Sequence, residues 1–213
     1  MMNVLCQICV YGFLLFGLSD SLLAKEPSYR RVLSKWTASD TDYARSDSMA
    51  NLAATATYLS EAWFDARVQS YAKENNLSAD EKESYEKTLA ARFRKEPTLF
   101  LAFYTRDKLW NTLDRDTKKT ENGSAQSKRT DALEEPLWRL RLENNGTMCE
   151  PKRVSKIKKV SPEERYFFPY LNRWDSAYWV TFPETCVTDE TGKLVLRIDG
   201  VYGHVELNWK QKH

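Results

Sequence analysis

The sequence predicts an α+β protein, in which an N-terminal helical hairpin packs on or beside an antiparallel, immunoglobulin-like β-sandwich of about seven strands. Three observations predict this fold class. Residues 29–96 contain no proline or glycine, and their apolar residues recur at helical spacings. The second half of the chain instead alternates apolar and polar residues in short runs. Turn-forming residues separate these runs, and no helical pattern lies between them.

The first helix of the hairpin is predicted over residues 41–75. Its apolar positions are three or four residues apart and would share one face of the helix. These positions are Leu52, Ala56, Leu59, Trp63 and Ala66. We expect this face to pack against the rest of the protein.

The second helix is predicted to begin after Asn75-Asn76, with Ser78 as its N-cap. Glu81 can return a hydrogen bond to the backbone of Ser78, which is the reciprocal pattern of a capping box. Pro97 ends the segment, because proline has no backbone N–H to donate. The inner face of this helix would carry Tyr85, Leu89 and Phe93. The hairpin as a whole is assigned to residues 25–96.

The β-sandwich domain is predicted over residues 97–213. The apolar run 98–105 fits a buried strand, although a helix that continues to Asp114 fits the same run. Residues 114–135 contain no aromatic side chain and are predicted to be a mobile loop. Further strands are expected at 138–143, 154–160, 166–168, 177–182, 194–198 and 205–209, with turns at 144–146, 161–162, 191–192 and 199–200.

Residues 1–24 are predicted to be a cleaved signal peptide. The segment from Val4 to Leu18 is almost entirely apolar; it is shorter than a transmembrane helix of about 20 residues and suits the hydrophobic region of a secretory signal. Cleavage would leave Lys25 as the first residue. An uncleaved membrane anchor and a buried core helix are the alternatives. The expected location is periplasmic or secreted, with membrane association only through an uncleaved N-terminal segment.

Two cysteines, Cys149 and Cys186, remain after the predicted cleavage, which removes Cys6 and Cys9. Export to an oxidising compartment would allow a disulfide between them. Two half-buried free thiols are the alternative, because the bond needs Cα atoms within about 7 Å of each other. The formal net charge of +2 is too small to indicate a nucleic-acid partner.

Few residues suit catalysis or metal binding. The two histidines, His204 and His213, are not clustered, and no spacing typical of a metal site occurs. We therefore expect no metal and no cofactor. Paired carboxylates are the remaining enzymatic hypothesis, since two such groups can hydrolyse a glycosidic bond; the candidates are Asp175, Asp199 and Glu206. A turn explains Asp199, which precedes a glycine, so the protein is predicted not to be an enzyme.

An aromatic-rich segment, residues 166–182, offers candidate ligand-binding side chains. Trp179 is predicted to point outward, because its neighbours in the chain point into the core. Trp174 and Tyr202 are in predicted loops. Exposed aromatic rings such as these could bind carbohydrate by stacking on sugar rings. The alternative for Trp179 is burial beneath the helical hairpin.

A basic segment is the second candidate binding surface. Its cations are Lys152, Arg153, Lys156, Lys158 and Lys159. They would suit an anionic partner, such as lipid headgroups or an acidic polysaccharide. The alternative is an edge strand whose lysines prevent aggregation with other sheets.

Several segments carry a resemblance to known proteins. They are, in order, ATATYLSEA, TLFLAFYTRD, WRLRLEN, RYFFPY, YWVTFP and LRIDGVYGHVELNWK. Together they resemble an uncharacterised family of bacterial exported proteins and lipoproteins, in which a helical segment precedes an immunoglobulin-like β-domain. The resemblance covers most of residues 40–210 and implies export and a fold, but no activity. A lipoprotein signal needs cysteine where this chain has Lys25, so a soluble exported form is expected.

The predicted function is accordingly that of a non-enzymatic exported cell-envelope protein, acting as a structural or protein-interaction module. The alternative is a carbohydrate-binding module that uses exposed aromatic side chains. The partner would be an envelope protein or a glycan.

Overall fold

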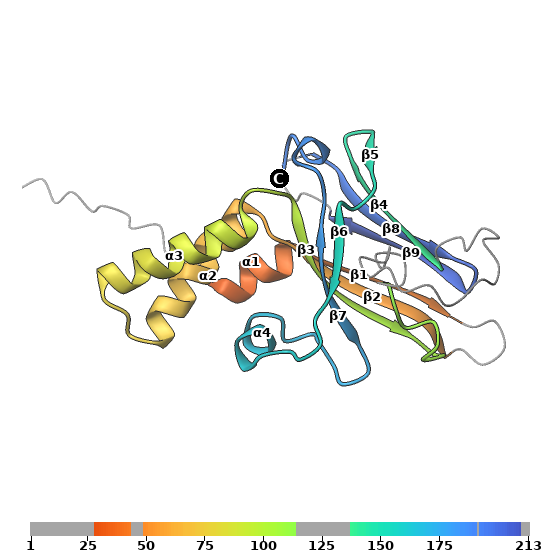
Figure 1. The fold of residues 1–213 in the computed structure, drawn as a ribbon, viewed down its shortest axis with the longest axis horizontal. Coiled ribbons are helices and arrows are strands. Elements are labelled where there is room, and N and C mark those ends of the chain that lie inside the picture. The colour runs from red at the N-terminus through yellow and green to blue at the C-terminus, as the bar shows by residue number, and fades with distance from the viewer. Residues whose placement is uncertain (1–27, 44–48, 114–136, 191, 210–213) are drawn as a thin grey trace, which may run out of the picture.

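Two antiparallel β-sheets and a group of helices beyond one end of them form the protein (Figure 1). The computed structural model describes residues 28–43, 49–113, 137–190 and 192–209. The α+β class is confirmed. The predicted signal peptide, Lys25, the predicted loop at 114–135 and His213 lie outside the described residues. Within the described residues, no helix has the length and apolar character needed to cross a membrane.

One sheet has five strands and the other has four. From edge to edge, the five-stranded sheet contains β1 (Thr37–Tyr43), β2 (Ala50–Tyr58), β3 (Thr98–Thr105), β7 (Ser176–Thr181) and β6 (Arg153–Lys156). The four-stranded sheet contains β5 (Thr147–Cys149), β4 (Trp138–Asn144), β8 (Leu194–Gly200) and β9 (Gly203–Trp209). All neighbouring strands pair antiparallel. Most predicted strands are present, whereas β1, β2 and β5 were not predicted.

The predicted helix over residues 41–75 is wrong for its first half, because β1 and β2 occupy most of residues 37–58. A spacing of four residues returns to the same side of a strand as well as to the same face of a helix. Leu52 and Ala56 therefore fit both structures. In the sheet they pair with Thr105 and Leu101 of β3, and both are fully buried.

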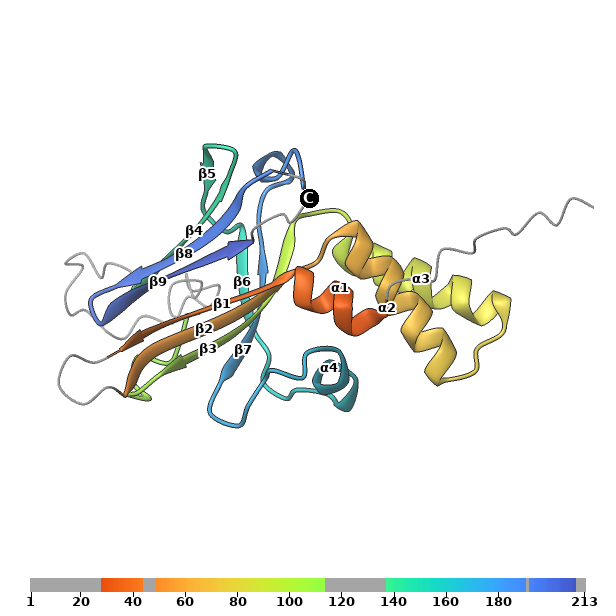
Figure 2. The same cartoon turned by 180° about the vertical axis from the view of Figure 1, so that it is seen from behind.

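The described helices are α1 (Tyr29–Lys35), α2 (Glu61–Glu74), α3 (Ala79–Phe93) and α4 (Pro162–Phe167), with a short 3₁₀ helix, η2 (Glu184–Cys186). The capping box predicted at Ser78 is confirmed: Ser78 N donates to Glu81 Oε2 at 2.8 Å, and Glu81 N donates to Ser78 Oγ at 3.4 Å. Figure 2 shows α1, α2 and α3 together at one end of the sheets. A helical hairpin over 25–96 is not confirmed, because this range also contains α1, β1 and β2.

Residues 166–168, predicted to be a strand, belong instead to the end of helix α4 and its C-cap. The helix has a capping box of its own, in which Ser161 N donates to Glu164 Oε2 at 2.8 Å and Glu164 N donates to Ser161 Oγ at 3.1 Å. Pro162 occupies the first helical position, where its missing N–H costs nothing. These local signals outweigh the β propensity of the aromatic residues that follow.

The two sheets face each other across a core of aliphatic and aromatic side chains. Phe103 of the five-stranded sheet packs against Trp138 of the four-stranded sheet, with ring centroids 5.2 Å apart. Along one margin β1 lies beside β9, where Glu206 N donates to Asp40 Oδ2 at 2.8 Å. At the other margin the chain passes from β5 directly to β6. The sheets therefore approach each other at the β1–β9 margin, whereas β6 stays an edge strand among the described strands.

The immunoglobulin-like topology is not confirmed. Constant-type immunoglobulin domains place the first two strands in one sheet and the third in the other. Here β1, β2 and β3 are consecutive neighbours in the five-stranded sheet.

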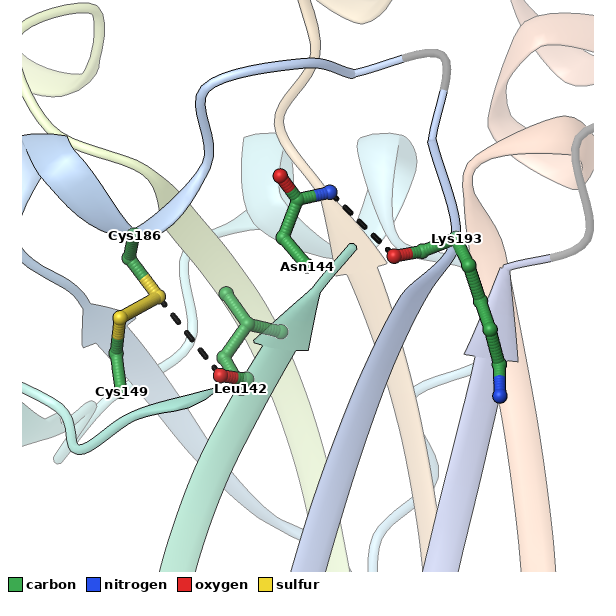
Figure 3. The surroundings of a disulfide bond; sticks show 5 residues. All are labelled: Leu142, Asn144, Cys149, Cys186 and Lys193. Carbon is green, nitrogen blue, oxygen red and sulfur yellow. Dashed lines mark hydrogen bonds between the residues drawn. A yellow bond between two sulfur atoms is a disulfide. The ribbon is translucent and has the colours of Figure 1, made fainter. Parts of the chain in front are cut away.

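A disulfide joins Cys149 at the end of β5 to Cys186 in η2, the helix that follows β7 (Figure 3). The two Cα atoms are 5.8 Å apart, which is within bonding range. Beside the disulfide, Asn144 Nδ2 donates to the carbonyl oxygen of Lys193 at 3.4 Å. The disulfide thus ties the edge of the four-stranded sheet to the chain that leaves the five-stranded sheet.

Candidate binding sites

The three predicted ligand-binding aromatic residues, Trp179, Trp174 and Tyr202, occupy three different environments. Trp179 lies on β7, Trp174 precedes it in a connecting loop, and Tyr202 lies in the turn between β8 and β9. The structure therefore does not gather them into one aromatic surface.

Trp179 is half-buried beneath helix α3. Its ring centroid is 4.6 Å from that of Phe93, and the Arg92 guanidinium carbon is 5.7 Å from the Trp179 centroid. Phe100 and Phe168 pack against the indole edge to face, at 4.9 and 5.8 Å. Trp179 does point outward from the sheet, but these residues cover it, so it does not offer an open stacking platform.

Tyr202 packs against Trp110, with ring centroids 4.0 Å apart. Trp110 in turn accepts a hydrogen bond through its carbonyl oxygen from Trp138 Nε1, at 2.8 Å. Tyr202 remains 40% exposed, but Trp110 already packs against its ring. Its main role in the structure is to hold the β8–β9 turn against the segment that follows β3.

Trp174 is the most exposed of the three candidates, at 56%, and it borders a pocket of about 410 Å³. The lining residues come from β2, from the end of β3 and the segment after it, and from the loop before β7: Ala53, Tyr104, Thr105, Arg106, Lys108, Asn111, Asn172, Trp174 and Asp175. Phe103 faces the four-stranded sheet, so Tyr104, the next residue, faces the opposite way. The pocket thus lies on the outer face of the five-stranded sheet.

Trp179 lies on the same outer face but nearer the helices. Its β3 partner is Phe100, which is four residues before Tyr104 and about 13 Å away along an extended strand. Helix α3 covers the Phe100 end of this face, and the Tyr104 end is open as the pocket. The sequence separated core from surface correctly on β7 but could not show which end of the face the helices cover.

The loop that carries Trp174 is held by side-chain hydrogen bonds. Trp174 N donates to Asn172 Oδ1 at 2.7 Å, and Asn172 N donates to Asp175 Oδ2 at 3.0 Å. Asn111 Nδ2 donates to the Trp174 carbonyl oxygen at 3.3 Å. Asn and Asp side chains commonly fix turns in this way. The indole is therefore presented from an ordered loop.

Two acceptor groups at the pocket have unused hydrogen-bonding capacity. Asn111 Oδ1 is buried and has no partner among the described residues. Asp175 is half-buried, and burial raises the pKa of its carboxyl above the usual value, an effect that the hydrogen bond from Asn172 partly offsets. Desolvated acceptors of this kind gain from a donor that enters the site. Tyr104, Asn111 and Asn172 were not predicted from sequence, because no motif marks them.

The carboxylates proposed for glycoside hydrolysis do not converge. Asp199 pairs with Arg141 at 2.7 Å, and Glu206 pairs with Arg197 at 2.9 Å, both in the four-stranded sheet. Asp175 lies in the loop before β7 of the other sheet, at the pocket. Among the described residues, no group of three or more His, Cys, Asp or Glu side chains could hold a metal ion. His204 is exposed on β9, opposite Asp199.

The predicted basic segment forms β6 and the residues around it. Lys152 makes an ion pair with Glu96, and the Lys156 ammonium lies 5.7 Å from the Tyr178 ring centroid. The other cations of the segment are exposed and make no ion pair with a described residue. They are Arg153, Lys158 and Lys159. A groove of about 460 Å³ runs along Lys152, Arg153, Val154 and Ser155.

Arg67 is a buried charge that the sequence did not single out. It is only 5% exposed. Its Nη2 donates to Glu163 of α4 at 2.6 Å, and its Nε donates to Tyr85 of α3 at 3.0 Å. The guanidinium also lies 4.5 Å from the Phe167 ring centroid. Since three helices meet at this side chain, its role is to join α2, α3 and α4.

A comparison of the chain with protein-family models, with curated proteins and with solved structures finds no match. The resemblance to a family of exported proteins stays a prediction.

Proposed function

We propose that the protein is a non-enzymatic, exported protein-interaction module that binds an extended, acidic polypeptide segment along the free edge of β6. The observation that carries this proposal is the exposed edge strand beside a groove lined by cations. Strand addition to a sheet edge is a common mode of peptide recognition, in which main-chain hydrogen bonds supply affinity.

The backbone of β6 has one side available for such pairing. β6 is the last strand of the five-stranded sheet, and β7 is its neighbour among the described strands. Ile157 N donates to Ala177 O at 2.8 Å, which fixes the phase of the ladder. Antiparallel pairs alternate between bonded and non-bonded residues, so Val154 and Lys156 direct their N–H and C=O groups away from β7. These groups can pair with an added strand.

The positive charges beside β6 favour an acidic partner strand. Arg153, Lys158 and Lys159 lie on or just beyond the edge, and a partner strand that carries Asp or Glu would meet them with opposite charge. A second copy of the same edge would bring like charges together, which is unfavourable. The same cations would also discourage uncontrolled sheet extension. An acidic partner satisfies both requirements.

Fluorescence anisotropy with two labelled ten-residue peptides, one alternating Glu with Thr and the other alternating Lys with Thr, tests the proposal. The Glu peptide should bind, and its affinity should fall as the salt concentration rises. The Lys peptide should not bind. Val154→Pro should abolish binding, because it removes an outward N–H without removing a bond to β7. Val154→Ala, which keeps the N–H, is the matched control. Equal binding of both peptides, or an unchanged affinity in Val154→Pro, contradicts the proposal.

Export is a separate part of the proposal, supported by the apolar segment Val4–Leu18. Expression of the full chain in a bacterial host, followed by fractionation and mass spectrometry, tests it. A mature chain that begins at Lys25 in the periplasm or medium is expected. Recovery of the uncut chain from the cytoplasm would count against export.

A further inference from the structure

We infer that the pocket beside Trp174 is a second binding site, for an acidic pyranose such as a hexuronic acid residue of a glycan. This inference does not rest on the proposed function at β6, which lies at the edge of the sheet and uses different residues. The pocket, of about 410 Å³, falls within the range of small-molecule sites, about 300–1,000 Å³.

An exposed, ordered indole supplies the surface on which a sugar ring could stack. The C–H bonds on one face of a pyranose carry partial positive charge, and the face of an aromatic ring carries partial negative charge. Trp174 is 56% exposed, and hydrogen bonds to both its N–H and its carbonyl oxygen hold its backbone. The Arg173 guanidinium lies over the indole, 4.5 Å from its centroid. Little order has to be gained on binding.

The hydroxyls of a sugar match the acceptors at the pocket. Asp175 Oδ2 accepts the backbone N–H of Asn172, and an ionised carboxylate has further lone pairs that can accept from a ligand. Asn111 Oδ1 is buried without a partner. Neighbouring hydroxyls on a pyranose can donate to a carboxylate, which is a charge-assisted and therefore stronger hydrogen bond. Tyr104 adds a second aromatic side chain to the wall.

A cation on another part of the wall selects an acidic sugar. Lys108 is exposed, lines the pocket and makes no side-chain hydrogen bond or ion pair with a described residue. It follows β3 in the chain, whereas Asp175 precedes β7. A ligand with a carboxylate at one position and hydroxyls at others can therefore meet Lys108 and Asp175 with opposite partners. A neutral hexose satisfies Asp175 but leaves the cation without a partner.

Isothermal titration calorimetry with the methyl glycosides of glucuronic acid and glucose, and with oligogalacturonate, tests this site. The acidic sugars should bind, and glucose should bind about tenfold more weakly. Trp174→Ala should lower the affinity for the acidic sugars by at least about tenfold. Lys108→Gln should reduce their affinity toward that of glucose. Tyr166→Ala is the matched control, because Tyr166 is 52% exposed and lies on α4 away from the pocket.

The outcomes separate clearly. No binding of any of the sugars, or Trp174→Ala binding as the wild-type chain does, overturns the site. Equal affinity for glucose and glucuronic acid overturns its assignment to acidic sugars. Val154→Pro, which disables the β6 edge, should leave sugar affinity unchanged, so a failure of the β6 proposal would be distinguishable from a failure here.

Discussion

The ring of Phe93 at the end of α3 lies 4.6 Å from the ring of Trp179 on β7. This contact attaches the helices to the outer face of the five-stranded sheet. Because Phe93 covers it, Trp179 does not form an open binding surface. Farther along β3 the same face is accessible, where Tyr104 and Trp174 border the pocket.

Phe93→Ala should lower the free energy of unfolding by about 3 kcal/mol, because it removes a buried aromatic ring and leaves a cavity. Urea unfolding measures the change. Quenching of tryptophan fluorescence by acrylamide should rise, since Trp179 loses its cover. Tyr166→Ala is the control: it removes an edge-to-face contact with Phe167 and should lower the free energy by only about 1 kcal/mol. A stability equal to that of the wild-type chain would show that α3 does not hold Trp179 in this way.

Loss of the Cys149–Cys186 disulfide should destabilise the fold. The two cysteines are 37 residues apart in the chain. Closing a loop of that length stabilises the folded protein by about 3 to 4 kcal/mol, because it lowers the conformational entropy of the unfolded chain. Urea unfolding of the oxidised and reduced protein measures the difference. The double variant Cys149→Ser with Cys186→Ala should match the reduced protein. Identical unfolding midpoints with and without reductant would contradict the prediction.

Glu163→Gln should lower the free energy of unfolding by about 2 kcal/mol. The substitution leaves the buried Arg67 guanidinium without its charged partner, and an unpaired buried charge is costly. The value is below that of a fully buried pair, because Glu163 is 41% exposed. Glu83→Gln is the matched control: it breaks the exposed ion pair with Lys87 and should cost less than about 0.5 kcal/mol. Equal effects of the two substitutions would refute a role for Arg67 in joining the helices.

Asp175→Asn should raise the melting temperature at pH 7. Burial raises the pKa of the Asp175 carboxyl above its ordinary value of 3.8, so the folded protein binds this proton more tightly than the unfolded chain does. Ionisation of Asp175 therefore opposes folding. The penalty is absent below the ordinary pKa and grows as the pH rises through the folded value.

Thermal unfolding at a series of pH values checks this prediction. The gain from Asp175→Asn should shrink toward zero near pH 3. Asp107→Asn is the control, since the Asp107 carboxylate also accepts a backbone N–H bond, from Leu109 at 2.9 Å, but is exposed. A gain that does not depend on pH would show that burial of the charge is not its cause.

Local signals in the sequence determined much of this protein. The capping box at Ser78 fixed the start of α3, and the alternation of apolar residues located β4, β7, β8 and β9. These features were predictable because each depends on neighbours within a few residues. The same local reasoning identified Trp174 and the cations around β6 as candidates.

Tertiary structure decided the rest. A spacing of four residues fits either a helix or a strand, so only the pairing of β2 with β3 settles Leu52 and Ala56 as strand residues. The pocket also depends on distant parts of the chain, because Tyr104, Asn111 and Trp174 meet only when β3 and β7 lie side by side. Exposure of an outward-facing residue depends on what packs over it. The sequence offered both Trp179, on a predicted strand, and Trp174, in a predicted loop, as exposed aromatic residues, but α3 covers Trp179 and leaves Trp174 open.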